Sequence, residues 1–254
     1  MIVSREVQLL EHFPPAVQVH FFGKPWQFHS LSWPQVLSAR WSLVTWLLRM
    51  DNLRGKFIVL DGPEGCGKST QLSFLKARLE NAGMPIVIAQ DPGTTRVGEQ
   101  LRFILLNPAH EEMAMRCEMF LYMASRAQLM SEVILPALDS NKIVVCDRFV
   151  SSTFAYQVNG ENLSVDDIRM VAQIAIQGRW PDLTILLDMP AETAMRRRQR
   201  AKDRIEQRPI HYHERVRENF LSQASADPDH YRVISADRPQ EAVHADIWKE
   251  ISNL

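Results

Sequence analysis

Cysteine is scarce in this sequence, and long apolar runs are missing from it. Of the 254 residues, three are cysteines, Cys66, Cys117 and Cys146. Their odd number and wide spacing exclude a disulfide framework and a zinc-finger pattern. No stretch reaches the roughly 18–20 apolar residues that a transmembrane helix needs. We therefore expect a protein of a reducing compartment, cytoplasmic and without a membrane partner.

An excess of charge of either sign is also absent. The 29 lysines and arginines nearly balance the 30 aspartates and glutamates, which leaves a net charge of −1. A chain without a basic excess has no general attraction to nucleic acid, so we expect small-molecule partners and no nucleic acid. Hydrophobic residues make up 46% of the chain, a proportion that is typical of a globular protein with a sizeable core.

Residues 1–50 differ in composition from the rest of the chain. They contain four of the six tryptophans but only two acidic residues, and several prolines interrupt any long element. We predict an N-terminal extension that is disordered or forms a short helix within residues 37–48. Three interpretations remain open. The extension is not part of the functional protein, which would start at Met50; it is a small helical appendage; or it is a targeting sequence, which its few basic residues disfavour.

Over residues 51–254, apolar strand candidates alternate with helical patterns. The strand candidates cover residues 56–61, 85–90, 142–147, 183–188 and 231–236. The helical patterns cover residues 70–82, 96–106, 111–138, 165–177, 191–200, 206–224 and 239–251. This alternation predicts an α/β three-layer sandwich, in which helices cover both faces of a five-stranded parallel sheet. Its ligand site should lie beyond the carboxyl ends of the strands.

The first strand candidate leads into a loop, Gly62 to Ser69, that matches the phosphate-loop pattern G-x-x-x-x-G-K-[ST] in full. A strand before the loop and a helix after it are the context that this motif requires, which disfavours a chance match. Lys68 would reach the β- and γ-phosphates of a nucleoside triphosphate, and Ser69 would bind Mg²⁺. The fold predicted is thus that of a P-loop NTPase. The predicted nucleotide-binding residues are Gly62, Pro63, Glu64, Gly65, Cys66, Gly67, Lys68, Ser69 and Thr70.

Arg102 is a candidate for binding a second phosphate group. It lies nine residues after Gly93, on the helix that follows a Pro-Gly turn at the end of the second strand candidate. An arginine at this place can hold a monophosphate by a bidentate contact. The alternative is an ordinary turn with Arg102 on a solvated helix face.

Tyr122 and Arg126 are candidates for binding a base. Their spacing of four residues puts them on one face of the predicted third helix. The ring of Tyr122 offers a surface for stacking, and Arg126 offers donors for a base carbonyl. Because apolar residues surround the pair in the sequence, a core stripe is the alternative.

Asp147 and Arg148 follow the third strand candidate, next to the strand that carries the phosphate loop. A carboxylate there fits a metal-linked role, and the neighbouring guanidinium can neutralise phosphoryl oxygens. An ordinary ion pair is the alternative, because Asp-Arg dipeptides are common.

A basic run follows the fourth strand candidate and its helix. Residues 196–208 contain seven basic and two acidic side chains. Such a run is commonly a solvated face or a nucleic-acid patch. Since the net charge of the chain is not basic, we favour a mobile lid over residues 196–208 that closes over phosphates and supplies arginine.

From Gly55 to the C-terminus, about 200 residues, the chain resembles the thymidylate kinases. The resemblance rests on ordered segments that are weak singly and specific together. They are the phosphate loop, Asp-Pro-Gly-Thr-Thr with Gly-Glu-Gln-Leu-Arg, Tyr-x-x-x-Arg, Asp-Arg-Phe, Pro-Asp-Leu-Thr and Asp-Arg-Ile-Glu. It implies a nucleoside monophosphate kinase domain that transfers the γ-phosphoryl group of ATP to dTMP with Mg²⁺. It also implies a homodimer with a contact from the third helix.

The resemblance further implies roles for residues around the acceptor phosphate and sugar. Glu64 would lie near the sugar, and Arg102 would hold the acceptor phosphate. Arg148 would bridge the donor and acceptor phosphates. Tyr156 would crowd the 2′ position of the sugar and thereby favour deoxyribose.

For the base, the resemblance implies that Tyr122 stacks on thymine and that Arg126 binds a thymine carbonyl. Thr153 and Gln157 would also touch the base. Relatives usually carry Phe at the position of Tyr122.

Catalytic residues implied by the resemblance are Lys68, Arg148, Arg200 and Arg204. The phosphate loop carries no arginine among its variable positions, and in this family the lid then supplies the catalytic arginine. Mg²⁺ would be bound by Ser69 and linked to Asp147.

Several positions depart from the family pattern. Asp61 and Asp91 stand where Glu is usual, and Ser125 stands where Asp or Asn is common. Cys66 lies among the loop amides, where a lowered thiol pKa would permit redox inhibition, although an inert small residue is the simpler interpretation. Two other functions stay open: a kinase for another nucleotide or a nucleoside, and a non-catalytic ATP-binding protein.

Overall fold

The structure is a computed structural model that describes residues 20–21, 24–25, 51–158, 163–197 and 203–254. The chain divides into two compact units, Met1–Leu48 and Arg49–Leu254. In the first unit, β1 (His20–Phe21) pairs antiparallel with β2 (Lys24–Pro25). The sequence did not predict this short pair, and the helix predicted within residues 37–48 lies outside the described residues.

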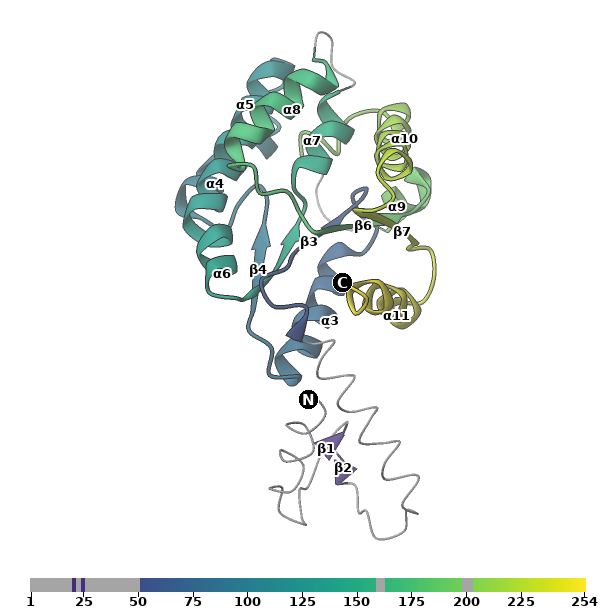
Figure 1. Cartoon of the computed structure of the whole chain (residues 1–254). Helices are drawn as coiled ribbons and strands as arrows, with labels where there is room; N and C mark the ends of the chain where they lie inside the picture. Colours follow the sequence, from purple (N-terminus) through teal and green to yellow (C-terminus); the bar gives the residue numbers. More distant parts are fainter. Residues whose placement is uncertain (1–19, 22–23, 26–50, 159–162, 198–202) are drawn as a thin grey trace. The chain divides into compact units, whose positions relative to one another are not determined.

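The second unit is built on a five-stranded parallel sheet (Figure 1). The order of the strands is β4 (Ile86–Gln90), β5 (Ile143–Asp147), β3 (Phe57–Asp61), β6 (Leu183–Asp188) and β7 (Tyr231–Ser235). Each strand boundary lies within one residue of its prediction, so the predicted sheet is confirmed. The strands β3 and β5 are buried over their whole length, because strands and helices surround them, and they therefore consist mainly of apolar residues.

Helices cover both faces of this sheet (Figure 1), which confirms the predicted α/β architecture. On one face α3 (Lys68–Asn81) packs against α11 (Gln240–Ile251). The other face carries α5 (Met115–Leu129), α7 (Val150–Gln157), α8 (Val165–Ala175) and α10 (Ile210–Ala226). Beside α5 lies α4 (Arg96–Leu106), and α9 (Ala191–Arg196) follows β6. Within the described residues, none of the helices is long and apolar enough to span a membrane.

The third helix differs from its prediction. The sequence predicts one helix over residues 111–138, but the structure has α5, a π-helical segment η2 (Met130–Ile134) and then α6 (Leu135–Asp139). Pro136 explains the interruption, because proline has no N–H to donate and its ring clashes with the carbonyl four residues earlier. A π-helical turn before it relieves this clash.

Two further helices differ from the prediction. The sequence analysis missed α7, which begins directly after Phe149 and has most of its side chains buried between neighbouring helices. The helix α10 begins after Pro209 and not at Glu206 as predicted. Proline is poorly accommodated inside a helix but is tolerated at its start, so the helix begins after it.

Candidate active site

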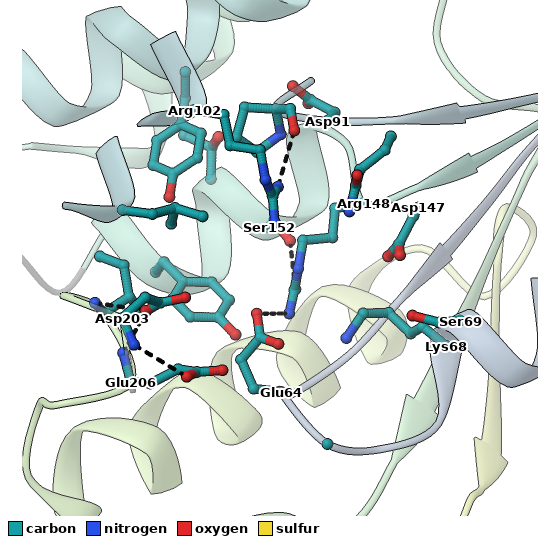
Figure 2. A pocket seen from close by; sticks show the side chains of 18 of the residues that line it. Glu64, Lys68, Ser69, Asp91, Arg102, Asp147, Arg148, Ser152, Asp203 and Glu206 are labelled. Carbon is teal, nitrogen blue, oxygen red and sulfur yellow. Dashed lines mark hydrogen bonds and ion pairs between the residues drawn. The ribbon is translucent and has the colours of Figure 1, made fainter. Parts of the chain in front are cut away.

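Most of the predicted site residues line one cavity of about 610 Å³ at the carboxyl ends of the strands (Figure 2). The phosphate loop and the start of α3 form one side of it. The other side consists of residues from α4, α5 and α7 and from the segment 203–206. Among the predicted loop residues, six line the cavity: Glu64, Gly65, Gly67, Lys68, Ser69 and Thr70.

The backbone of the phosphate loop explains its glycines. Gly65 has a φ of +81°, and a Cβ at this position would lie 2.3 Å from the backbone oxygen of Ala194, so only glycine fits. Gly67 has a φ of +99°, yet nothing lies within 4 Å of the place where its Cβ would be. The loop is therefore packed against α9 at Gly65 and open at Gly67. This opening lets a phosphate group approach the N-terminus of α3.

Lys68 is held inside the loop by backbone carbonyls. Its Nζ donates to Gly62 O at 3.0 Å and to Pro63 O at 2.9 Å. Cys66 Sγ lies 3.7 Å from the same nitrogen. Burial raises the pKa of the Cys66 thiol, and Lys68 only partly opposes this. The geometry thus supports Cys66 as a neutral packing residue, although it places the thiol next to the lysine amine of the motif.

Asp147 and Ser69 offer oxygen ligands for a cation on the loop side of the cavity. Asp147 ends β5, and its buried Oδ1 has no hydrogen-bond partner. Burial raises the pKa of Asp147, while Lys68 and Arg148 oppose that rise. A buried carboxylate oxygen without a partner beside a serine hydroxyl fits Mg²⁺, which prefers such hard oxygen ligands. In the described part of the chain, no cluster of three acidic, histidine or cysteine side chains could bind a metal alone.

Arg148 reaches from the end of β5 into the middle of the cavity (Figure 2). Its φ of +66° is unusual for a residue with a Cβ, so the surrounding structure must hold it there. The Nη2 atom pairs with Glu64 Oε1 at 2.5 Å, and Nη1 donates to Asp61 Oδ1 at 3.1 Å. Burial disfavours the charged guanidinium, but these carboxylates hold the pKa of Arg148 well above its usual range. Arg148 is therefore a fixed positive charge.

The second half of the cavity contains the residues predicted to bind an acceptor nucleotide. Arg102 lines it and donates from Nη1 to Pro92 O at 2.9 Å (Figure 2). Tyr122 also lines the cavity, and burial raises the pKa of its hydroxyl. The same half is also lined by Thr153, Tyr156 and Gln157. These three residues lie on α7, a helix that the sequence analysis did not predict.

Arg126 is both a core residue and a cavity residue. Its side chain is 1% exposed and lies at the cavity wall. Its Nε pairs with Asp91 Oδ2 at 2.6 Å, and its Nη2 donates to Phe149 O at 3.1 Å and Thr153 Oγ1 at 3.2 Å. The two interpretations of this residue from the sequence, base contact and core packing, are thus compatible.

Of the two predicted lid arginines, the structure describes Arg204 but not Arg200, which lies outside the described residues. Arg204 is not among the residues that line the cavity, and its guanidinium pairs with Glu118 Oε2 at 2.5 Å. Residues beside Arg204 do line the cavity, namely Asp203 and Glu206, which the sequence analysis quoted in a motif without assigning a role. Arg197 also lines it and was overlooked among the basic residues of the lid.

A phosphate loop and, in the same cavity, a second half lined by Arg102, Tyr122 and Arg126 are typical of a nucleoside monophosphate kinase of the P-loop class. Comparisons with known proteins agree with this class. The sequence model of the thymidylate kinase family matches residues 60–247. The chain therefore belongs to the thymidylate kinase family.

Individual bacterial relatives give the same result. The chain is 44% identical over 200 residues to the thymidylate kinase of Pelotomaculum thermopropionicum, a match that covers 78% of this chain and 93% of the relative. It is 42% identical over 201 residues to that of Deinococcus radiodurans, covering 78% and 97% of the two chains. It is 43% identical over 199 residues to that of Neisseria gonorrhoeae, covering 78% and 96%.

Proposed function

We propose how this cavity carries out the reaction of the family, in which the γ-phosphoryl group of ATP is transferred to dTMP to give ADP and dTDP. One observation carries the proposal. In Figure 2, Arg148 lies between Arg102 and the phosphate-loop residues Glu64 and Lys68, and all four line the cavity. Such an arrangement lets two anionic substrates meet at a fixed cation. Catalysis of phosphoryl transfer consists mainly of this positioning and of charge stabilisation.

The loop side binds the triphosphate of ATP. The open backbone at Gly67 and the N-terminus of α3 supply N–H donors, and Lys68 exchanges its carbonyl partners for phosphate oxygens. Ser69 and Asp147 would hold Mg²⁺, with the remaining ligands coming from phosphates and water. When bound, the ion neutralises charge on the phosphates.

The other side binds dTMP. Arg102 holds its phosphate, the ring of Tyr122 stacks on thymine, and Arg126 contacts a thymine carbonyl through a donor that remains after its bonds to the protein. The acceptor atom is a phosphate oxygen, and a phosphate monoester has a second pKa of about 6. Most of the acceptor is therefore dianionic near neutral pH, and no protein group has to remove a proton from it.

Arg148 would contact both phosphates, and Glu64 both fixes this arginine and faces the acceptor sugar. Thr153, Tyr156 and Gln157 complete the wall around the sugar and base. From the lid, Arg200 is the arginine that we propose to stabilise the charge on the transferring group.

The test is ADP release by the full chain with ATP and Mg²⁺, measured against dTMP, dUMP, UMP, CMP and thymidine. We expect a strong preference for dTMP. Activity with thymidine but not dTMP would overturn the acceptor-phosphate role of Arg102. ATP binding without any acceptor-dependent ADP release would indicate a non-catalytic protein.

We also propose that the protein is a homodimer. Large apolar side chains are exposed on three adjacent helices, with exposed fractions of 71% for Phe103 of α4, 55% for Phe120 of α5, and 67% and 76% for Met170 and Ile174 of α8. Such a patch is typical of a surface that another protein covers. In light scattering, Phe120→Asp should reduce the mass to that of a monomer, whereas Val233→Asp, on the edge strand β7, should not. A wild-type monomer would refute the proposal.

The location that we propose is cytoplasmic. It is supported by Cys66, Cys117 and Cys146, all of which are free thiols, as expected in a reducing compartment.

A further inference from the structure

Glu118 is a fully buried carboxylate that the mechanism above does not use. It lies on α5, one helical turn before Tyr122. Its Oε2 accepts from Arg204 Nη2 at 2.5 Å and from Arg208 Nη2 at 2.9 Å. Its Oε1 accepts from Gln157 Nε2 at 2.7 Å. Burying a carboxylate is costly unless such partners compensate it, so the whole group must stay together for any member to stay buried.

Arg204 ties this group to the end of α4. Its Nε donates to Leu105 O at 2.9 Å, and its backbone N–H donates to Leu106 O at 3.1 Å. The last carbonyls of a helix have no partners within the helix, so Arg204 caps α4. The helix capped in this way also carries Arg102, the residue proposed to hold the acceptor phosphate.

Arg208 ties the group to α7 and α10. Its Nη1 donates to the hydroxyl of Tyr212 at 2.5 Å, and that hydroxyl donates to Tyr156 O at 3.1 Å. The guanidinium also lies over the ring of Tyr212, with Cζ 4.5 Å from the ring centroid. Five elements are thus tied to one carboxylate, directly or through Arg204 and Arg208: α4, α5, α7, α10 and the segment 203–208.

We propose that Glu118 is a positioning residue that latches the segment 203–208 to the acceptor half of the cavity, and that Arg204 acts in this latch without touching the phosphates. The proposal rests on the acceptor site proposed above. Asp203 and Glu206, one residue before and two residues after Arg204, line the cavity, and Figure 2 shows them on the opposite side of the view from Lys68 and Ser69. The contact between Glu118 and Arg204 therefore fixes the position of the cavity wall that faces dTMP. The wall that faces ATP does not depend on this contact.

The test uses the full chain with Glu118→Gln, which keeps the size of the side chain and removes its charge. The dissociation constant of dTMP alone and of a non-hydrolysable ATP analogue alone are measured by calorimetry, together with KM and kcat. We expect dTMP affinity to fall about tenfold, because misplacing binding groups by a fraction of an ångström has effects of this size, and ATP-analogue affinity to change by less than about twofold. Glu132→Gln, which removes an exposed carboxylate in η2, is the matched control and should change neither.

A double-mutant cycle examines the contact itself. If Glu118 and Arg204 act as a unit, Glu118→Gln with Arg204→Gln should weaken dTMP binding no more than the worse single variant. If the Glu118→Gln variant does not fold, Arg208→Gln is used instead, because this variant leaves the carboxylate of Glu118 paired with Arg204. The dTMP affinity should then fall by less than in Glu118→Gln, and the ATP-analogue affinity should again stay nearly unchanged.

Different results separate the possible failures. Equal weakening of both nucleotides, or unchanged dTMP affinity, would overturn the latch. A fall in kcat for Arg204→Gln with unchanged dTMP affinity would make Arg204 a catalytic residue and also overturn it. Absence of dTMP kinase activity in the wild-type chain would instead refute the proposed function.

Discussion

Replacing Arg126 by methionine would leave the buried carboxylate of Asp91 without its charged partner. In the structure Asp91 Oδ2 lies 2.6 Å from Arg126 Nε, and Asp91 Oδ1 is buried without a hydrogen-bond partner. Breaking a buried ion pair from one side costs about 3–5 kcal/mol of stability, because the remaining charge is uncompensated. Methionine has a comparable length, so little of this loss should come from an empty cavity.

The loss of stability in Arg126→Met should depend on pH, and the direction of this dependence follows from the pKa of Asp91. Burial raises this pKa above the ordinary value, and Arg126 opposes the rise. Without Arg126 the pKa of Asp91 should therefore rise further. A carboxyl group whose folded pKa exceeds its unfolded pKa binds more protons when folded, so the free energy of unfolding falls as the pH rises between these two values. The variant should thus be more strongly destabilised at pH 7.5 than at pH 5.

The assay is urea unfolding of the wild type and Arg126→Met at both pH values, with Asp91→Asn/Arg126→Met as control. The double variant has no buried charge at positions 91 and 126, so its loss should be smaller and should not depend on pH in this way. A loss for Arg126→Met that is equal at both pH values would refute the reasoning. So would a double variant that is as unstable as the single one at pH 7.5.

Three further predictions concern the loop side of the cavity, and a fourth concerns the reactivity of the cysteines. Lys68→Ala should abolish ADP release without a change in melting temperature of more than a few degrees; wild-type kinetics in this variant would contradict the phosphate-loop role. Arg148→Lys should lower kcat at least about a hundredfold, because lysine is a point charge and cannot form the same fork of hydrogen bonds. Asp147→Asn should shift the Mg²⁺ dependence of the rate to roughly tenfold higher concentration, and an unchanged Mg²⁺ titration would remove this residue from the site. In alkylation with iodoacetamide monitored by mass spectrometry, the exposed Cys117 should react quickly and the buried Cys66 should not, and rapid labelling of Cys66 would restore the redox interpretation.

Local sequence was sufficient where the physical constraint is itself local. The phosphate loop needs glycines for its backbone and a strand and helix on its two sides, all within a short stretch, and the central strands β3, β5 and β6 are largely apolar runs. The spacing of Tyr122 and Arg126 put both on one helix face, and the structure has both at the cavity wall. Such local motifs follow from the requirements of phosphate binding, so the resemblance to the family could be recognised from them.

The tertiary structure decided what depends on residues that are far apart in the chain. The helix α7 has a modest pattern of its own and forms between other helices, which determines the place of Thr153, Tyr156 and Gln157. The sequence alone does not distinguish the roles of the seven basic residues in the run 196–208. Only the packing shows that Arg204 pairs with Glu118, 86 positions earlier in the chain. Sequence determined which chemical groups this protein has, because motifs are local. Folding determined which of them meet, because a buried charge selects its partner by proximity in space.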